Sequence, residues 1–237
     1  MGAIALTIPR SPLAETLVDC QNAVDHFMVG ASDLDAGIAW FEKLTGVRPV
    51  FVGKPEGRTN DGVARAGVQN ATVSIGPRQY LEIIAPDPSE PNGAARILPL
   101  LRSLQIPRPF AWGAKLENVD ELRHKMQVGG LAYDPPTTGS RTRPDGRVVE
   151  WVNLYPVNFP NHVSPVLPFF IQWSANSVHP SADSPAGCTL AGLRFESPNA
   201  EATTSLFRKL GLRADVRPAS QPRILVTLVT RHGRVEL

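Results

Sequence analysis

The chain has 237 residues, of which 42% are hydrophobic and 19% are charged, and its formal net charge is +2. Apolar residues are sufficient for a globular core, whereas the small net charge without a basic patch argues against nucleic acid as a partner. No apolar stretch approaches the roughly 20 residues that span a bilayer, and the N-terminus lacks the basic region of a signal peptide. We therefore expect a soluble, cytoplasmic protein that binds neither membranes nor nucleic acid.

The first elements form a β-α-β-β-β unit after an N-terminal arm at residues 1–23. An apolar run from Val24 predicts a strand, and Ser32 is a suitable N-cap for the helix that follows. Gly46 is a typical helix stop. Three β-type runs then occur at residues 49–52, 71–75 and 80–85. We define residues 24–85 as module 1.

The same order of elements returns twice further along the chain. A Pro-rich linker at residues 86–108, with a short helical stretch, leads to module 2 at residues 109–175. There Asn118 is the predicted N-cap. Module 3, a partial repeat at residues 188–237, has Ser197 in that position. Repeats of this length are supersecondary units that must pack against partners. The pattern predicts an α+β fold.

Two polar residues lie within apolar runs of module 1. His26 belongs to the run from Val24 to Val29, and Glu82 to the run from Tyr80 to Ile84. A buried carboxylate is costly unless it is paired, hydrogen-bonded or bound to a metal. The two residues therefore form a private pair or part of a metal site. Otherwise His26 is hydrogen-bonded within its strand, and Glu82 is paired with an arginine such as Arg58 or Arg65.

Several motifs are similar to those of one protein superfamily. The matching stretches are 24–27, 33–35 with 41–49, 80–88, 140–146 with 150–151, 168–171 with Trp173, 179–180 and 233–237. Over residues 22–237 the chain resembles the vicinal oxygen chelate superfamily and, more narrowly, the bacterial glyoxalase-like domain proteins. This resemblance implies that modules 1 and 2 face each other as mixed sheets, which form a half-open barrel cleft.

The resemblance also implies a metal site and a reaction class. His26 and Glu82 occupy the positions at which the superfamily places metal ligands, and Glu82 could also act as a catalytic base. The metal would be Fe, Mn, Zn or Ni, or none. The corresponding positions of module 2 hold Trp112 or Gly113, and Ile171 or Gln172. The predicted function is that of a divalent-metal-dependent lyase, isomerase or dioxygenase acting on a small oxygenated molecule. The alternative is a metal-free protein of the same fold that binds or sequesters a small molecule.

Further candidates surround this pair. His179 could be the third metal ligand, or a loop histidine that orders the connection to module 3. Arg141 and Arg143 could hold an anionic substrate, or they are solvated turn residues with Arg143 paired to Glu150. Other residues could contact substrate in the cleft or pack in the core: Asn70, Trp112, Trp151, Gln172, Phe170 and Trp173. The sheet of module 3 has no predicted cover on one face, which either closes against modules 1 and 2 or pairs with its copy in a second subunit. On the second alternative we expect a homodimer.

Overall fold

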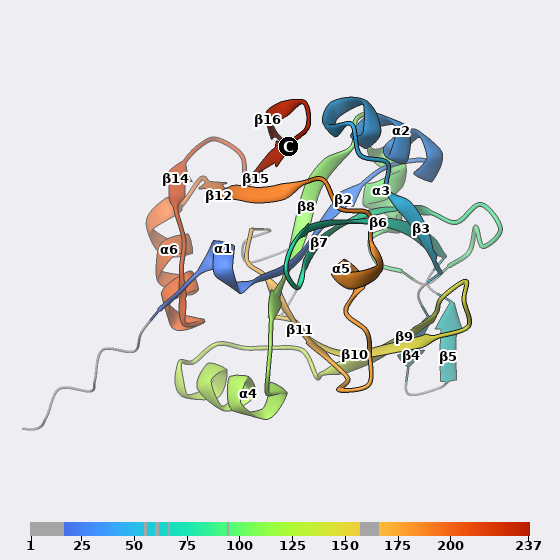
Figure 1. Cartoon of the computed structure of the whole chain (residues 1–237). Helices are drawn as coiled ribbons and strands as arrows, with labels where there is room; N and C mark the ends of the chain where they lie inside the picture. Colours follow the sequence, from blue (N-terminus) through green and yellow to red (C-terminus); the bar gives the residue numbers. More distant parts are fainter. Residues whose placement is uncertain (1–16, 55, 60–61, 66, 94, 157–165) are drawn as a thin grey trace, which may run out of the picture.

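The computed structural model describes residues 17–54, 56–59, 62–65, 67–93, 95–156 and 166–237. In these residues the strands form a ten-stranded sheet, a four-stranded sheet and a two-stranded sheet. The larger sheets and the helices that cover them fill most of the molecule (Figure 1). This arrangement confirms the predicted α+β class.

Module 1 contributes six strands and one helix. They are β2 (Val24–Gly30), α2 (Leu34–Thr45), β3 (Val50–Gly53), β4 (Glu56–Thr59), β5 (Gly62–Arg65), β6 (Val68–Gly76) and β7 (Gln79–Pro86). The N-cap of α2 is Asp33, whose side chain accepts from the Ala36 amide, and not Ser32 as predicted. The helix ends at Gly46 with φ 72°, a left-handed conformation that glycine adopts without strain.

Module 2 and the linker before it supply the other half of the ten-stranded sheet. Their elements are α3 (Leu98–Ser103), β8 (Arg108–Lys115), α4 (Val119–Val128), β9 (Thr137–Thr142), β10 (Val148–Leu154) and β11 (Phe169–Trp173). Asn118 caps α4 as predicted, and its side chain accepts from the amides of Asp120 and Glu121.

The two halves join through the antiparallel pair β2–β8, in which His26 lies opposite Gly113. The strand order is β3-β6-β7-β2-β8-β11-β10-β9-β4-β5. The β4–β5 hairpin, which follows β3 in the chain, thus pairs with β9 at the far edge of the sheet. This crossover brings the two edges of the sheet towards each other. The result is the barrel-like mixed sheet of the predicted cleft.

Alternating side chains give this sheet two different faces. On β7, Leu81 and Ile83 belong to the main hydrophobic core on the outer face, which α2 covers. Tyr80 and Glu82 alternate with them and lie on the inner face, as does His26 on β2. At one end of the inner face, Leu101 of α3 and its C-cap residue Leu104 pack against Ile84. A short helix, α5 (Pro180–Asp183), lies across the mouth of the barrel between β6–β7 and β10 (Figure 1).

Module 3 packs on the outer face of the barrel. It contains β12 (Thr189–Ser197), α6 (Ala200–Lys209), β13 (Leu212–Arg213), β14 (Val216–Pro218), β15 (Arg223–Thr230) and β16 (Gly233–Glu236). The N-terminal elements β1 (Val18–Asp19) and α1 (Cys20–Ala23) lie beside it. Asn199 caps α6, one step beyond Ser197–Pro198, so the predicted cap at Ser197 is wrong.

The core of module 3 is continuous with that of the barrel. One cluster of buried residues includes Trp112 of β8, Phe195 of β12 and Phe207 of α6. The sheet face that we expected to be uncovered is therefore covered within the same chain. A homodimer stays a prediction, but this argument for it no longer holds.

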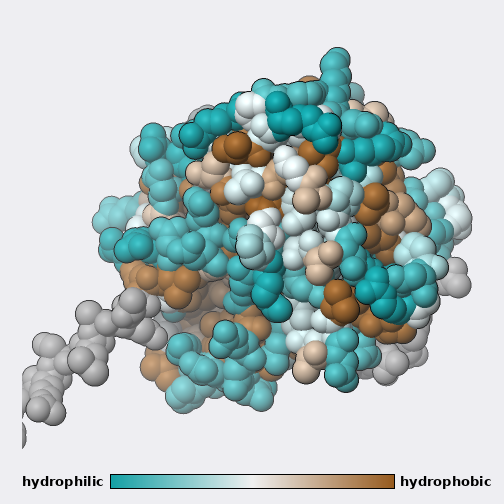
Figure 2. Space-filling model, viewed as in Figure 1, coloured by the Kyte–Doolittle hydropathy of each residue, from teal (hydrophilic) through white to brown (hydrophobic). Residues whose placement is uncertain are grey.

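The surface in the view of Figure 2 is largely hydrophilic, with apolar patches that are small and separate. Among the described residues, no helix has the length and hydropathy needed to cross a membrane.

Candidate functional site

Asp25 is the centre of a polar network at one end of the inner face. It is 1% exposed. Its Oδ1 lies 2.8 Å from Nδ1 of His26, and its Oδ2 lies 3.1 Å from both Nε2 of His179 and Nε1 of Trp173. Burial alone raises the pKa of Asp25, but the hydrogen bonds from His179 and His26 outweigh burial and lower this pKa to about 2. Asp25 is therefore ionised at neutral pH and accepts from three ring N–H groups.

This network determines which nitrogen of each histidine carries the proton. An ionised carboxylate only accepts, so Nδ1 of His26 must donate to Asp25. In His179 the backbone N–H of Ser181 donates to Nδ1, so the proton lies on Nε2, which faces Asp25. No hydrogen bond within the described residues reaches Nε2 of His26. In the neutral ring that atom is an acceptor.

Aromatic rings hold His26 in place. The Tyr80 ring stacks on it at a centroid distance of 4.6 Å, and Phe169 packs edge-on at 5.3 Å. Gly113 makes room for the ring, because a Cβ atom there would lie 3.0 Å from Cε1 of His26. Burial raises the pKa of Tyr80 well above its usual value, and the Glu82 charge adds to this effect. Tyr80 therefore stays a neutral phenol next to the imidazole.

A second polar group lies two residues further along the inner face. Glu82 accepts a short hydrogen bond from Nδ2 of Asn70, and Nη2 of Arg141 lies 3.4 Å from the same carboxylate oxygen. Asn70, Glu82 and Arg141 are 1%, 5% and 4% exposed. The Arg141 guanidinium also lies over the Trp151 ring, 5.8 Å from its centroid. We call Asn70, Glu82 and Arg141 the polar triad.

Residues 174–187, which we call the strap, close the mouth of the barrel. His179 reaches Asp25, and Asp183 forms a short ion pair with Arg143 of the loop after β9. Ser184 bonds to Thr72 of β6 at 2.7 Å between hydroxyl oxygens, and the carbonyl of Pro185 accepts from the Ser74 amide. The strap thus ties module 2 to module 1 across the cleft.

The residues predicted as metal ligands lie on the inner face but do not form a ligand set. Both nitrogens of His179 are engaged, by Asp25 and by Ser181, and one oxygen of Glu82 is engaged by Asn70 and Arg141. No group of three or more His, Cys, Asp or Glu side chains in the described part of the chain is arranged to hold a metal ion. We expected Glu82 to pair with an arginine, and in the structure that arginine is Arg141. The side chains of Arg58 and Arg65 lie outside the described residues.

The predicted substrate-contacting residues divide between the two faces. Asn70, Arg141 and Trp151 are on the inner face, whereas Arg143 lies at the mouth and pairs with Asp183 and not with Glu150. Trp112 is fully buried on the outer face, where its ring stacks with Phe195 at 5.6 Å. Its predicted place in the cleft is therefore wrong.

Gln172 also faces outward, because the side chain of its neighbour Trp173 points inward to Asp25. The Gln172 carbonyl oxygen accepts from the Val119 amide at the first turn of α4. Its predicted contact with a substrate in the cleft is wrong.

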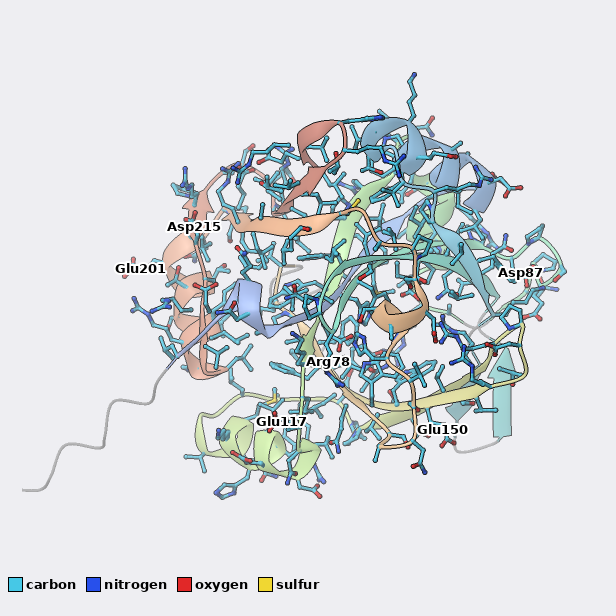
Figure 3. All side chains as sticks on the ribbon, viewed as in Figure 1. Arg78, Asp87, Glu117, Glu150, Glu201 and Asp215 are labelled. Carbon is cyan, nitrogen blue, oxygen red and sulfur yellow. The ribbon has the colours of Figure 1, made fainter. Side chains whose placement is uncertain are left out.

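Two cavities border the barrel. One, of about 300 Å³, lies along β9–β11, and its lining includes the outward-facing Ser140, Glu150 and Gln172 together with Trp151 and Trp173. Glu150 points away from the barrel in Figure 3. The other, of about 180 Å³, is apolar and lies between α4 and α6, beside Met126 and Leu206. Neither cavity is lined by Asp25, His26 or the polar triad.

A family model described as a glyoxalase-like domain matches residues 24–211. The chain belongs to this family. Among solved structures, this glyoxalase-like chain is similar to a hypothetical protein from Staphylococcus aureus, with 13% identity, a TM-score of 0.66 and coverage of 90% of this chain and 97% of that one. That likeness shows that the two chains share a fold. No curated protein matches the chain.

Two epimerases are more distant structural neighbours. Methylmalonyl-CoA epimerase from Mycobacterium tuberculosis has 15% identity and a TM-score of 0.41, with 68% of this chain and 92% of that chain covered. The Streptomyces coelicolor enzyme has 17% identity and the same TM-score, with 65% and 98% covered. Neither likeness bears on the chemistry of this glyoxalase-like site.

Sequence reasoning missed Asp25, the centre of the network. A signal was present, because Asp25 is a second polar residue next to His26 in the same apolar run. Its partners His179 and Trp173 are 154 and 148 residues away in the sequence. No local pattern could therefore have identified them.

Proposed function

We propose that this glyoxalase-like chain is an enzyme of the isomerase or lyase type that moves a proton on a small oxygenated molecule, with His26 as the acid–base group. The observation that carries the proposal is the Asp25–His26 contact, which leaves Nε2 of His26 as an acceptor on the inner face. A carboxylate that fixes the tautomer and orientation of a histidine is a recurrent device of acid–base catalysis.

The chemistry needs no group beyond this chain and the substrate. Nε2 of His26 takes a proton from a carbon next to a carbonyl, and the electron pair of the C–H bond moves into an enolate. The imidazolium then returns a proton to the same or a neighbouring atom. Asp25, with a pKa of about 2, stays ionised and stabilises the imidazolium. The neutral Tyr80 phenol packs beside the ring.

The predicted divalent metal does not fit the side chains as they are arranged. A cation held by His26, Glu82 and His179 would need a free nitrogen on His179, and both of its nitrogens are engaged. It would also lie next to the positive guanidinium of Arg141, the partner of Glu82. We therefore derive no step through a metal.

Proton exchange with solvent tests the proposal. Dihydroxyacetone, pyruvate and hydroxypyruvate each carry hydrogen on a carbon next to a carbonyl, and ¹H NMR in D₂O follows the loss of that signal. We expect the protein to accelerate exchange of at least one compound above the buffer rate. His26→Gln, which can still donate to Asp25, should lower the rate about 100-fold or more.

The matched control is His124→Gln, a change of an exposed histidine on α4 that should leave exchange unaltered. Exchange by His26→Gln at the wild-type rate, or no exchange of any compound by the wild type, would overturn the proposal. The assay is repeated with EDTA and with added Fe²⁺, Mn²⁺, Zn²⁺ or Ni²⁺. We expect no change with EDTA. A rate that depends on an added metal would instead support the predicted metal site.

The second candidate is a metal-free protein that binds a small molecule without converting it. The strap supports this candidate, because it covers the inner face and leaves His26 only 4% exposed. Binding without any proton exchange would favour it over the enzyme. The two functions differ only in whether Nε2 of His26 meets an acidic C–H group.

A further inference from the structure

The polar triad contains two buried polar atoms that have no hydrogen-bond partner in the part of the chain that the structure describes. Nε of Arg141 and Oδ1 of Asn70 are both inaccessible to solvent and make no hydrogen bond within the described residues. A buried donor or acceptor that stays unpaired costs free energy, and each such atom in a native protein calls for an explanation. Their position on the inner face of the barrel, near His26, suggests that a ligand supplies the missing partners.

Charge fixes the orientation of the Asn70 amide. Its Nδ2 faces the Glu82 carboxylate, and a flipped amide would place two oxygens in contact. Oδ1 of Asn70 is therefore the free acceptor, and it needs a donor such as a hydroxyl group.

Arg141 has an unused donor, whereas Asn70 has an unused acceptor. Among the described residues, Arg141 makes one ion-pair contact, of 3.4 Å to Glu82, and Nε of its planar guanidinium has no partner. A guanidinium binds carboxylates best through two parallel N–H groups. The side chain passes over Gly53, where a Cβ atom would lie 3.5 Å from Cδ of Arg141, and over the Trp151 ring. These contacts fix the direction in which the guanidinium N–H groups point.

We infer that the polar triad binds a small hydroxycarboxylic acid, whose carboxylate meets Arg141 and whose hydroxyl donates to Asn70. The inference rests on the proposed function in one respect, since the bound compound is the one whose proton His26 moves. Glu82 then acts as a positioning residue that orients both Asn70 and Arg141. Entry of the acid requires the strap to move away from the mouth of the barrel.

Three compounds of similar size test the two contacts separately. Glycolate has both groups, acetate lacks the hydroxyl, and glycolamide lacks the charge. Isothermal titration calorimetry of the full chain measures their affinities. We expect glycolate to bind at least tenfold more tightly than either analogue.

Variants assign the contacts to residues. Arg141→Lys keeps the charge but loses the two parallel N–H donors of the guanidinium, and should weaken glycolate binding about tenfold or more. Asn70→Ala should bring the affinity for glycolate down to that for acetate. Arg217→Gln, a change of an exposed arginine that pairs with Asp215, should leave binding unaltered. Unfolding curves show which variants retain the fold, and the three-compound comparison on the wild type does not depend on them.

The outcomes separate this inference from the proposed function. His26→Gln should abolish proton exchange and retain glycolate binding. Selective glycolate binding without exchange would reject the acid–base enzyme and support the binding site. Equal or absent binding of the three compounds would overturn the inference, even where exchange is observed. Buried water would then be the partner of Asn70 and Arg141.

Discussion

At the scale of single residues, Gly113 explains why the second module has no counterpart of His26. The two residues lie opposite each other on β2 and β8. The position that would repeat the histidine is therefore the one that must accept its ring. A side chain at Gly113 would meet His26 and Phe169, so only one module can supply an imidazole at this junction.

Replacement of Gly113 by alanine should displace the His26 ring. The new Cβ would lie 3.0 Å from both Cε1 of His26 and Cζ of Phe169, and we expect a loss of about 1–3 kcal/mol in the free energy of unfolding. Urea unfolding measures this loss, and the ¹⁵N signals of the imidazole report the shift of the ring.

The matched control is Gly192→Ala, in the first strand of module 3. Its Cβ would lie 3.4 Å from Thr227, an ordinary contact, so stability should change little. Equal losses in the two variants would mean that the close approach at Gly113 is relieved without moving His26.

Asp25 gives a prediction for the dependence of stability on pH. Its pKa is lowered from 3.8 to about 2 in the folded state, so it stabilises the fold above about pH 4. This contribution, of the order of 2 kcal/mol, is lost as the pH falls through 2. Urea unfolding between pH 5 and pH 2 should therefore show a smaller loss for Asp25→Asn than for the wild type.

Asp25→Asn should also be destabilised at pH 7, by about 3 kcal/mol, because an amide cannot accept from three donors. Asp33→Asn is the control. Asp33 is an exposed N-cap, and asparagine caps equally well. An identical acid profile for wild type and Asp25→Asn would show that Asp25 is not protonated in this range.

At the scale of elements, the strap depends on side-chain contacts. Helix α5 has only four residues, too few to be stable by helix formation alone. It is held by His179, by Ser184 and by the ion pair of Asp183 with Arg143, a residue that is 7% exposed. A polar loop histidine before a proline could be recognised in the sequence, but the surface that it contacts could not.

Arg143→Gln should loosen the strap without unfolding the barrel. A hydrogen bond to a charged group is worth about 1.5–3 kcal/mol, so amide exchange of residues 177–184 should become at least tenfold faster. Hydrogen-exchange mass spectrometry measures this rate. Arg48→Gln, which removes an exposed pair with Glu42, should leave exchange of the strap unchanged. Equal exchange in Arg143→Gln and wild type would contradict the role of the ion pair.

Helix boundaries show the limit of local reasoning at this scale. Asn118 was predicted correctly as a cap, whereas the caps of α2 and α6 lie one and two residues after the predicted ones. Ser32 and Asp33 are both good caps, and so are Ser197 and Asn199. The sequence offers both choices, and packing of the helix on the sheet selects one.

At the scale of the whole molecule, module 3 is part of one core with the barrel. The Phe207 ring of α6 lies 4.9 Å from Phe195 and 6.4 Å from Trp112 of the barrel, by ring centroids. The apolar cluster that contains them runs from Cys20 to Leu228. A separate stable domain at residues 188–237 is therefore not expected.

Phe207→Ala should lower the free energy of unfolding of the entire chain by about 3–5 kcal/mol in a single transition. Differential scanning calorimetry and tryptophan fluorescence, which reports the barrel, should give the same midpoint. Ile106→Ala, at a side chain that is 68% exposed, should change stability by less than about 0.5 kcal/mol. Two resolved transitions in Phe207→Ala would show that module 3 unfolds on its own.

The sequence by itself determined the α+β class and the repeated order of strands and helices, because both depend on periodicity and on helix start and stop signals, which are local. The family resemblance implied that His26 and Glu82 lie in the cleft. The tertiary structure alone decided the partners. His26 is bound by Asp25, which also holds His179 and Trp173 from the far end of module 2, and Glu82 is held by Arg141 and Asn70. Such contacts depend on how the sheet curves and on where the strap crosses it, and both follow from packing between residues far apart in the chain.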